Sequence, residues 1–139
     1  MKRGKKFGLV WEDKPEKVVE ISKMELPVLE EVKERAVQQK DLATANLILE
    51  GDNYHSLSAL NYTHSGKIDF IYIDPPYNTG ARDWRYNNDY VDDTDAFRHS
   101  KWLSFMAHRI KLAKNLLADD GVICVTIDDY EMPRLWILL

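Results

Sequence analysis

The feature that most constrains this chain is an apolar run that ends abruptly in an acid and two prolines. Residues 69–73 read DFIYI, and Asp74, Pro75 and Pro76 follow directly. Such a continuous apolar run is typical of a strand that is covered on both faces in a parallel sheet. Because prolines donate no backbone hydrogen bond, they end the strand in a stiff turn. We therefore expect residues 69–73 to form a central strand.

Segments on both sides of this run alternate between strand and helix patterns. Strands are expected at 46–49 and 122–127, helices at 53–65 and from about Thr94 or Asp95 to about Ala118, and a turn at 119–121. The longer helix carries an apolar stripe at Leu103, Met106, Ile110, Ala113 and Leu117, with basic residues on its other face, Arg109 among them. This order predicts an α/β fold with a partial doubly wound parallel sheet.

Two segments have a different character. Residues 1–45 are expected to form a charged helical arm that packs or binds a partner, with an amphipathic helix from Leu26 to Val37. Residues 74–94 are polar and longer than the about 12–15 residues of usual structureless connections. We expect a functional or mobile loop there.

Composition excludes several classes of function. Nineteen Lys and Arg against 23 Asp and Glu leave a net charge of −4, so nucleic-acid contact has to be local. The one cysteine, Cys124, excludes an internal disulfide, is expected in the core and fits a cytoplasmic protein. No run approaches the about 20 apolar residues of a membrane span. The four histidines lack ligand spacing, so no metal site is expected.

Acidic residues follow each predicted strand. The three strand ends are followed by Asp52, by Asp74, and by Asp128 with Asp129. Since ligands of doubly wound sheets bind beyond the carboxyl ends of strands, these acids are candidates to line one cleft. A helix cap or a turn explains Asp52 and Asp128 at least as well.

The sequence Asp74-Pro75-Pro76-Tyr77 has the elements of an amine-binding site. A carboxylate and a backbone carbonyl in a rigid frame can accept both hydrogens of an exocyclic amino group, and Tyr77 offers a ring on which an extruded base can stack. Methyl transfer from a sulfonium donor would then depend on positioning and electrostatics. A chance diproline turn is the alternative.

Six stretches of the chain resemble one protein family. The chain resembles the modification (Mod) subunits of type III restriction-modification systems, a circularly permuted group of β-class DNA adenine-N6 methyltransferases. The resemblance implies catalysis at Asp74, Pro75, Pro76 and Tyr77 on a flipped adenine, S-adenosylmethionine as donor, a restriction (Res) subunit as partner and a dimer of the full-length subunit. The matching stretches are 8–12 (GLVWE), 26–29 (LPVL), 49–57 (LEGDNYHSL), 66–80 (GKIDFIYIDPPYNTG), 98–106 (RHSKWLSFM) and 120–129 (DGVICVTIDD).

The chain departs from this family in one respect. The family's Phe-x-Gly-x-Gly cofactor motif and target-recognition region follow the catalytic half, whereas no Gly-x-Gly occurs here. We therefore expect residues 46–139 to be the catalytic half of a truncated methyltransferase domain, inactive alone. An incomplete sheet is also expected to favour association.

Further site residues are predicted around the motif. Cofactor contacts are expected from Asp52, Asp74 and Asn78. DNA contacts are expected from Thr79, Arg82, Arg85 and Lys101, with Trp84 beside them, although the acids at 89–95 disfavour a broad basic surface.

Two alternatives to adenine methylation remain open. A non-catalytic remnant acting in assembly is one, and an enzyme acting on cytosine N4 or an RNA base is the other, because those amines pose the same geometric problem.

Overall fold

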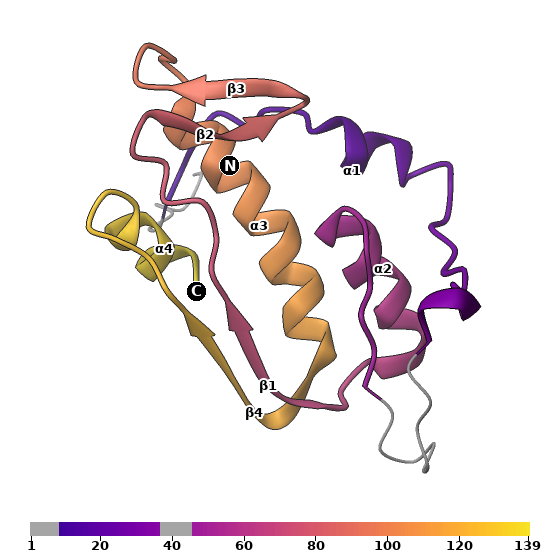
Figure 1. The fold of residues 1–139 in the computed structure, drawn as a ribbon. Helices are drawn as coiled ribbons and strands as arrows, with labels where there is room; N and C mark the ends of the chain where they lie inside the picture. Colours follow the sequence, from indigo (N-terminus) through magenta and orange to yellow (C-terminus); the bar gives the residue numbers. More distant parts are fainter. Residues whose placement is uncertain (1–8, 37–45) are drawn as a thin grey trace, which may run out of the picture.

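The computed structural model describes residues 9–36 and 46–139. It shows a mixed α/β fold with a small parallel sheet (Figure 1), which confirms the predicted fold class. The helices are α1 (Lys17–Ile21), α2 (Asn53–His64), α3 (Arg98–Leu116) and α4 (Met132–Leu138), with a 3₁₀ turn, η1 (Lys33–Arg35). The strands are β1 (Ile68–Ile73), β2 (Ala81–Tyr86), β3 (Asp89–Asp92) and β4 (Leu117–Val125).

The parallel sheet pairs β1 with β4. Ile71 lies opposite Ile123 and Ile73 opposite Val125, and α3 forms the crossover that parallel strands require. The register shifts between Leu117 and Val122, where a Cβ on Gly121 would lie 2.8 Å from the carbonyl oxygen of Ile68. The predicted turn at 119–121 is therefore an irregularity inside β4 and not a separate connection.

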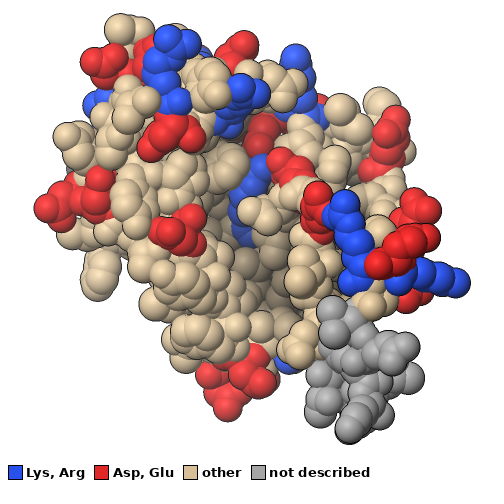
Figure 2. Space-filling view, in the orientation of Figure 1, with Lys and Arg blue, Asp and Glu red and all other residues tan. Residues whose placement is uncertain are grey.

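One face of this sheet is open. Ile73 and Val125 pack against the core, whereas Phe70 and Tyr72 are 59% and 58% exposed and Cys124 is exposed. Figure 2 shows a mostly uncharged surface over β1 and β4. The expectations of a strand covered on both faces and of a buried Cys124 were wrong, because the described residues supply packing to one face alone.

Two predicted elements near the N-terminus do not form. Residues 26–36 hold only η1, and their apolar side chains are exposed, with Val28 at 89%; Val37 lies outside the described residues. Residues 46–49 form no strand, and Ile48 is 96% exposed. Short apolar patterns gain regular structure mainly from burial, and no neighbour covers these two.

Residues 81–92 form an antiparallel hairpin where we expected a loop. Asn87 and Asn88 both have positive φ, as a two-residue type I′ turn between β2 and β3 requires. Trp84, Tyr86 and Val91 point from the hairpin into the core. Burial of these three side chains explains why the polar sequence is nevertheless ordered.

Helix α3 supplies most of the core. Trp102, Leu103 and Met106 are buried in the cluster that the hairpin and α4 also enter. The helix begins at Arg98, later than predicted. Residues 95–98 form a turn, in which the N–H of Arg98 donates to the carbonyl of Asp95 and the side chain of Asp95 accepts from the N–H of Phe97. The predicted apolar stripe at Leu103, Met106 and Ala113 is buried.

Arg109 lies inside the molecule, although we assigned it to the polar face of α3. Its Nη1 and Nη2 donate to the two carboxylate oxygens of Glu16 at 3.0 and 2.8 Å, and Nη2 also reaches Oδ1 of Asp52 at 3.1 Å. The guanidinium stacks 3.7 Å from the ring centroid of Phe105. This ion pair joins the segment before α1 to α3 and to the start of α2.

Two global features complete the description. Among the helices that the structure describes, none combines the length and the apolar character that a membrane span needs. Within residues 9–36 and 46–139, no three His, Cys, Asp or Glu side chains come together as a metal site would require.

The buried ion pair yields a prediction about stability. Glu16→Ala is expected to lower the free energy of unfolding by about 3–5 kcal/mol, because it leaves the buried guanidinium of Arg109 without its bidentate partner. Urea denaturation measures this loss. Glu50→Ala is the matched control: its partner Arg35 is exposed, so the loss is expected to be about 0–1 kcal/mol. Equal losses in the two variants would contradict a structural role for the buried pair.

Candidate functional site

The Asp74-Pro75-Pro76-Tyr77 motif lies at the carboxyl end of β1, with its acid and phenol facing each other. Oδ1 of Asp74 accepts hydrogen bonds from the hydroxyls of Thr126, at 2.6 Å, and Tyr77, at 2.9 Å. The side chain of Asp74 is exposed. Among the described residues no donor bonds Oδ2 of Asp74. One carboxylate oxygen is thus held by protein, and the other is available to a ligand.

The two hydroxyls also set the charge state of this pair. Hydrogen bonds from Thr126 and then Tyr77 lower the pKa of Asp74 below its ordinary value of 3.8. The same bond to Asp74 raises the pKa of the Tyr77 phenol. Near neutral pH the site therefore presents an ionised carboxylate beside a protonated phenol.

The diproline turn presents only one of its two carbonyls. The carbonyl of Pro76 accepts a hydrogen bond of 2.7 Å from Nε1 of Trp102 and is therefore occupied. No donor within the described ranges bonds the carbonyl of Pro75. The acceptors left at the motif are Oδ2 of Asp74 and the Pro75 carbonyl.

The side chain of Asn78 is buried and has a structural role. Its side chain is 0% exposed; its Nδ2 donates to Oε1 of Glu131 at 2.5 Å, and its Oδ1 accepts from Nε1 of Trp84 at 3.1 Å. Its backbone has a φ of +58°, a conformation that Asn adopts more readily than most residues. Both polar atoms of this side chain bond buried partners. Neither is accessible for the cofactor contact that we predicted.

Glu131 and Thr126 are site residues that sequence reasoning missed. Glu131 is fully buried, and its Oε1 accepts from Asn78 and pairs with Nδ1 of His99 at 2.5 Å. Thr126 follows β4 directly and reaches Asp74. Both partners lie more than 50 positions along the chain from the motif. The one available signal was that parallel strands end at the same edge of a sheet, which places residues after 125 near Asp74.

Two of the acids predicted at strand ends make local hydrogen bonds. Asp52 caps α2 by accepting from the backbone N–H of Tyr54, and it also contacts Arg109. Asp128 accepts from the N–H of Tyr130 in a local turn. The cap and turn explanations therefore describe Asp52 and Asp128 in this structure.

The residues predicted to contact DNA differ in how exposed their side chains are. Arg82 and Arg85 are exposed on β2, and both lie over the ring of Tyr90, which also accepts a hydrogen bond from Arg85. Trp84 between them is buried in the core, so it is not available to DNA. Lys101 is paired with Asp95 at 2.5 Å. Figure 2 shows acidic and basic side chains intermixed over the hairpin.

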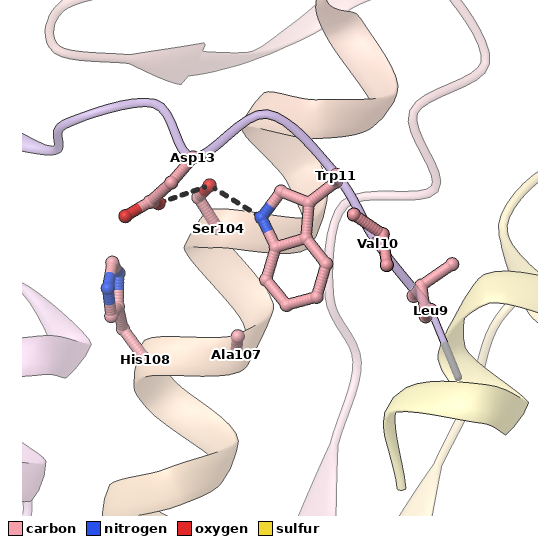
Figure 3. Close-up of a pocket in the computed structure, with 7 residues that line it drawn as sticks. All are labelled: Leu9, Val10, Trp11, Asp13, Ser104, Ala107 and His108. Carbon is pink, nitrogen blue, oxygen red and sulfur yellow. Dashed lines mark hydrogen bonds between the residues drawn. The ribbon is translucent and has the colours of Figure 1, made fainter. Parts of the chain in front are cut away.

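The remaining features are Thr79, the last of the predicted DNA contacts, and two cavities. Thr79 is partly buried beside the motif. A cavity of about 330 Å³ lies between residues 9–13 and α3, where Ser104 accepts from Trp11 and donates to Asp13 (Figure 3). A second cavity lies against α4, beside Trp136. Neither of these two cavities is lined by residues 74–77.

Trp102 yields a prediction about the frame of the motif. Trp102→Phe is expected to lower the free energy of unfolding by about 1–3 kcal/mol, because the Pro76 carbonyl loses its buried donor. Thermal or urea denaturation measures the change. Trp136→Phe is the matched control; this side chain is 80% exposed, so a change within about 0.5 kcal/mol is expected. An equally small effect at Trp102 would show that the bond does not hold the turn.

Comparisons with known proteins agree with the resemblance found in the sequence. The probable type III restriction-modification enzyme HindVI Mod subunit of Haemophilus influenzae is 50% identical over 94 residues, covering 68% of this chain and 12% of that protein. The type II methyltransferase M.KpnI of Klebsiella pneumoniae is 42% identical over 98 residues, covering 70% and 24%. The EcoPI Mod subunit of Escherichia phage P1 is 34% identical over 134 residues, covering 80% and 21%.

The chain thus spans less than a quarter of the length of these relatives. Residues 68–139 match the family model described as DNA methylase, and this stretch includes the whole Asp74-Pro75-Pro76-Tyr77 motif. The predicted resemblance to Mod subunits is confirmed by these matches. Because the family model covers more than half of it, the chain belongs to the DNA methylase family.

Proposed function

We propose that this chain carries the base-binding half of a DNA adenine-N6 methyltransferase from a restriction-modification system. The reaction would move a methyl group from S-adenosylmethionine to the amino group of a flipped adenine. The observation that carries the proposal is the state of Asp74: one oxygen is bonded by two hydroxyls, and the other is unbonded and exposed beside an unused carbonyl.

The geometry of these acceptors suits an aromatic amine. The amino lone pair of adenine is delocalised into the ring, so the amine is a poor nucleophile until acceptors bind its hydrogens. Oδ2 of Asp74 and the carbonyl of Pro75 are the two acceptors offered. Because Thr126 and Tyr77 already hold Oδ1, the carboxylate is set in place before the base arrives.

Tyr77 supports the proposal through its position. Its hydroxyl donates to Asp74, which keeps the phenol ring next to the proposed amine acceptors. The ring is only partly buried, and an aromatic face at this place offers a flipped base a stacking surface. One residue would thus orient both the carboxylate and the base.

The donor fits the described residues in part. The negative charge of Asp74 suits a neighbouring sulfonium, which supplies an electrophilic methyl group when bound. Asn78 has no exposed side-chain atom, and Oδ1 of Asp52 already accepts from Tyr54 and Arg109. The absence of a Gly-x-Gly motif from the sequence supports our view that most of the cofactor site lies outside this chain and that the chain alone is inactive.

DNA, a restriction subunit and a second copy of the full-length subunit are the proposed partners. The relatives named as Mod subunits of type III restriction-modification enzymes support the restriction partner. Arg85 is exposed and has no acidic partner among the described residues, so it is the best-placed phosphate contact of the four residues predicted. Arg82 pairs with Asp92 at 3.7 Å but its side chain stays 66% exposed, whereas Lys101 is ion-paired and mostly buried and Thr79 is partly buried.

A hybrid protein tests the proposed function. This chain would replace the matching segment of the Haemophilus Mod subunit, and tritiated S-adenosylmethionine and plasmid DNA would be added. Methyl incorporation is expected, with N6-methyladenine found after nucleoside digestion. N4-methylcytosine would contradict the adenine assignment, methylation of RNA alone would contradict the DNA assignment, and no incorporation would favour a non-catalytic remnant.

The role of Asp74 is tested in the same hybrid. Asp74→Ala is expected to reduce the rate of methyl transfer by about 10²–10³, the usual effect of removing a preorganised electrostatic contact. Asp129→Ala is the control, since this exposed acid lies near the same end of the sheet. Equal activity in the two variants would place the chemistry elsewhere.

A further inference from the structure

We propose that Thr126 is a positioning residue for methyl transfer, which holds one oxygen of Asp74 so that the other stays directed to the acceptor amine. The inference rests on the proposed function, because it concerns the same carboxylate. It adds a residue from a different strand, outside the Asp-Pro-Pro-Tyr motif.

The backbone brings Thr126 to this position. Its N–H donates to the carbonyl of Ile73, the last residue of β1, at 3.1 Å, so the pairing of β1 with β4 continues one residue past the end of β4. Ile73 directly precedes Asp74. The Thr126 side chain therefore lies against Asp74 as a consequence of strand register, and its hydroxyl makes the shorter of the two bonds to Oδ1.

Two hydrogen-bond donors fix the orientation of the Asp74 carboxylate, which a single donor would not. Asp74 is exposed, so a carboxylate with a single hydrogen bond would be able to rotate between orientations. Tyr77 holds it from the diproline turn, and Thr126 holds it from the residue that directly follows β4. The branched side chain of Thr126 has few rotamers, which makes it a stiff anchor.

The side chains that hydrogen-bond this carboxylate are both hydroxyl donors. Tyr77 donates to Asp74, and the hydroxyl of Tyr72 on β1 makes a long contact of 3.4 Å to Oγ1 of Thr126. No basic side chain among the described residues pairs with Asp74. The orientation of the carboxylate therefore depends on hydroxyl donors, and the loss of one is directly measurable.

The first test is a ¹³C NMR titration of the Asp carboxyl groups in the full 139-residue chain. Thr126→Val removes the hydroxyl at nearly constant volume and is expected to raise the pKa of Asp74 toward 3.8. Thr126→Ser keeps the hydroxyl and is expected to restore the low pKa. An unchanged Asp74 pKa in Thr126→Val would overturn the proposal.

Thr94 and Asp92 provide a matched control pair. The Thr94 hydroxyl donates to Oδ1 of Asp92 at 2.6 Å, the distance found between Thr126 and Asp74, and it lowers the pKa of Asp92. Thr94→Val is expected to raise the pKa of Asp92 and to leave Asp74 unchanged. A shift at both acids in either variant would indicate a general loss of structure and count against a local anchor.

The second test measures recognition of the amino group in the same samples. Adenosine and purine riboside differ by that group alone, and the chain is expected to bind adenosine about tenfold more tightly, which is the effect of one hydrogen bond to a charged group. Thr126→Val and Asp74→Ala are expected to lose this preference, and Thr126→Ser to keep it.

The outcomes separate the two proposals. If Asp74→Ala loses the preference and Thr126→Val retains it, the positioning role is overturned while the proposed function stands. If the unaltered chain shows no preference for adenosine, the base-binding function itself fails. A merely structural role for Thr126 would weaken the binding of both nucleosides equally.

Discussion

The parallel pairing of β1 with β4 is the interaction on which the candidate site depends. It places the residue after β4 beside the residue after β1, so that Thr126 meets Asp74 through a backbone bond between Thr126 and Ile73. It also requires a crossover, and α3, which forms that crossover, contributes Trp102 to the diproline turn. One strand register therefore positions both the acid and the turn that carries it.

Three alternate residues, Asp74, Pro76 and Asn78, are each held by a different part of the chain. Asp74 is held from β4, the carbonyl of Pro76 from α3, and Asn78 from the hairpin and the start of α4. This arrangement leaves Oδ2 of Asp74 and the Pro75 carbonyl as unused acceptors. A buried frame that ends in two exposed acceptors is a physical basis for preorganised binding of an amine. The same frame explains how an exposed carboxylate at Asp74 keeps a defined geometry.

Prediction from sequence succeeded where local chemistry determines structure. The apolar run before Asp74, the capped helix after Asp52 and the apolar stripe through Leu103 all correspond to elements of the structure. It failed for residues 26–36 and 46–49, whose apolar side chains have no neighbour to cover them. It also failed for 81–92, where three buried aromatic and aliphatic residues order a segment whose composition is typical of a loop. The Asn87-Asn88 turn was a readable local signal for that hairpin.

The sequence by itself determined the chemistry available to this protein: an acid, two prolines and a phenol in a fixed order at the end of a strand, together with the family to which that order belongs. Only the tertiary structure decided which atoms at this turn remain available, because the partners that bond Asp74, Pro76 and Asn78, apart from Tyr77, lie 6 to 53 positions away along the chain. Hydrogen bonds across such separations are set by strand register and helix packing. Those depend on how the whole core closes, and no local pattern of residues encodes them.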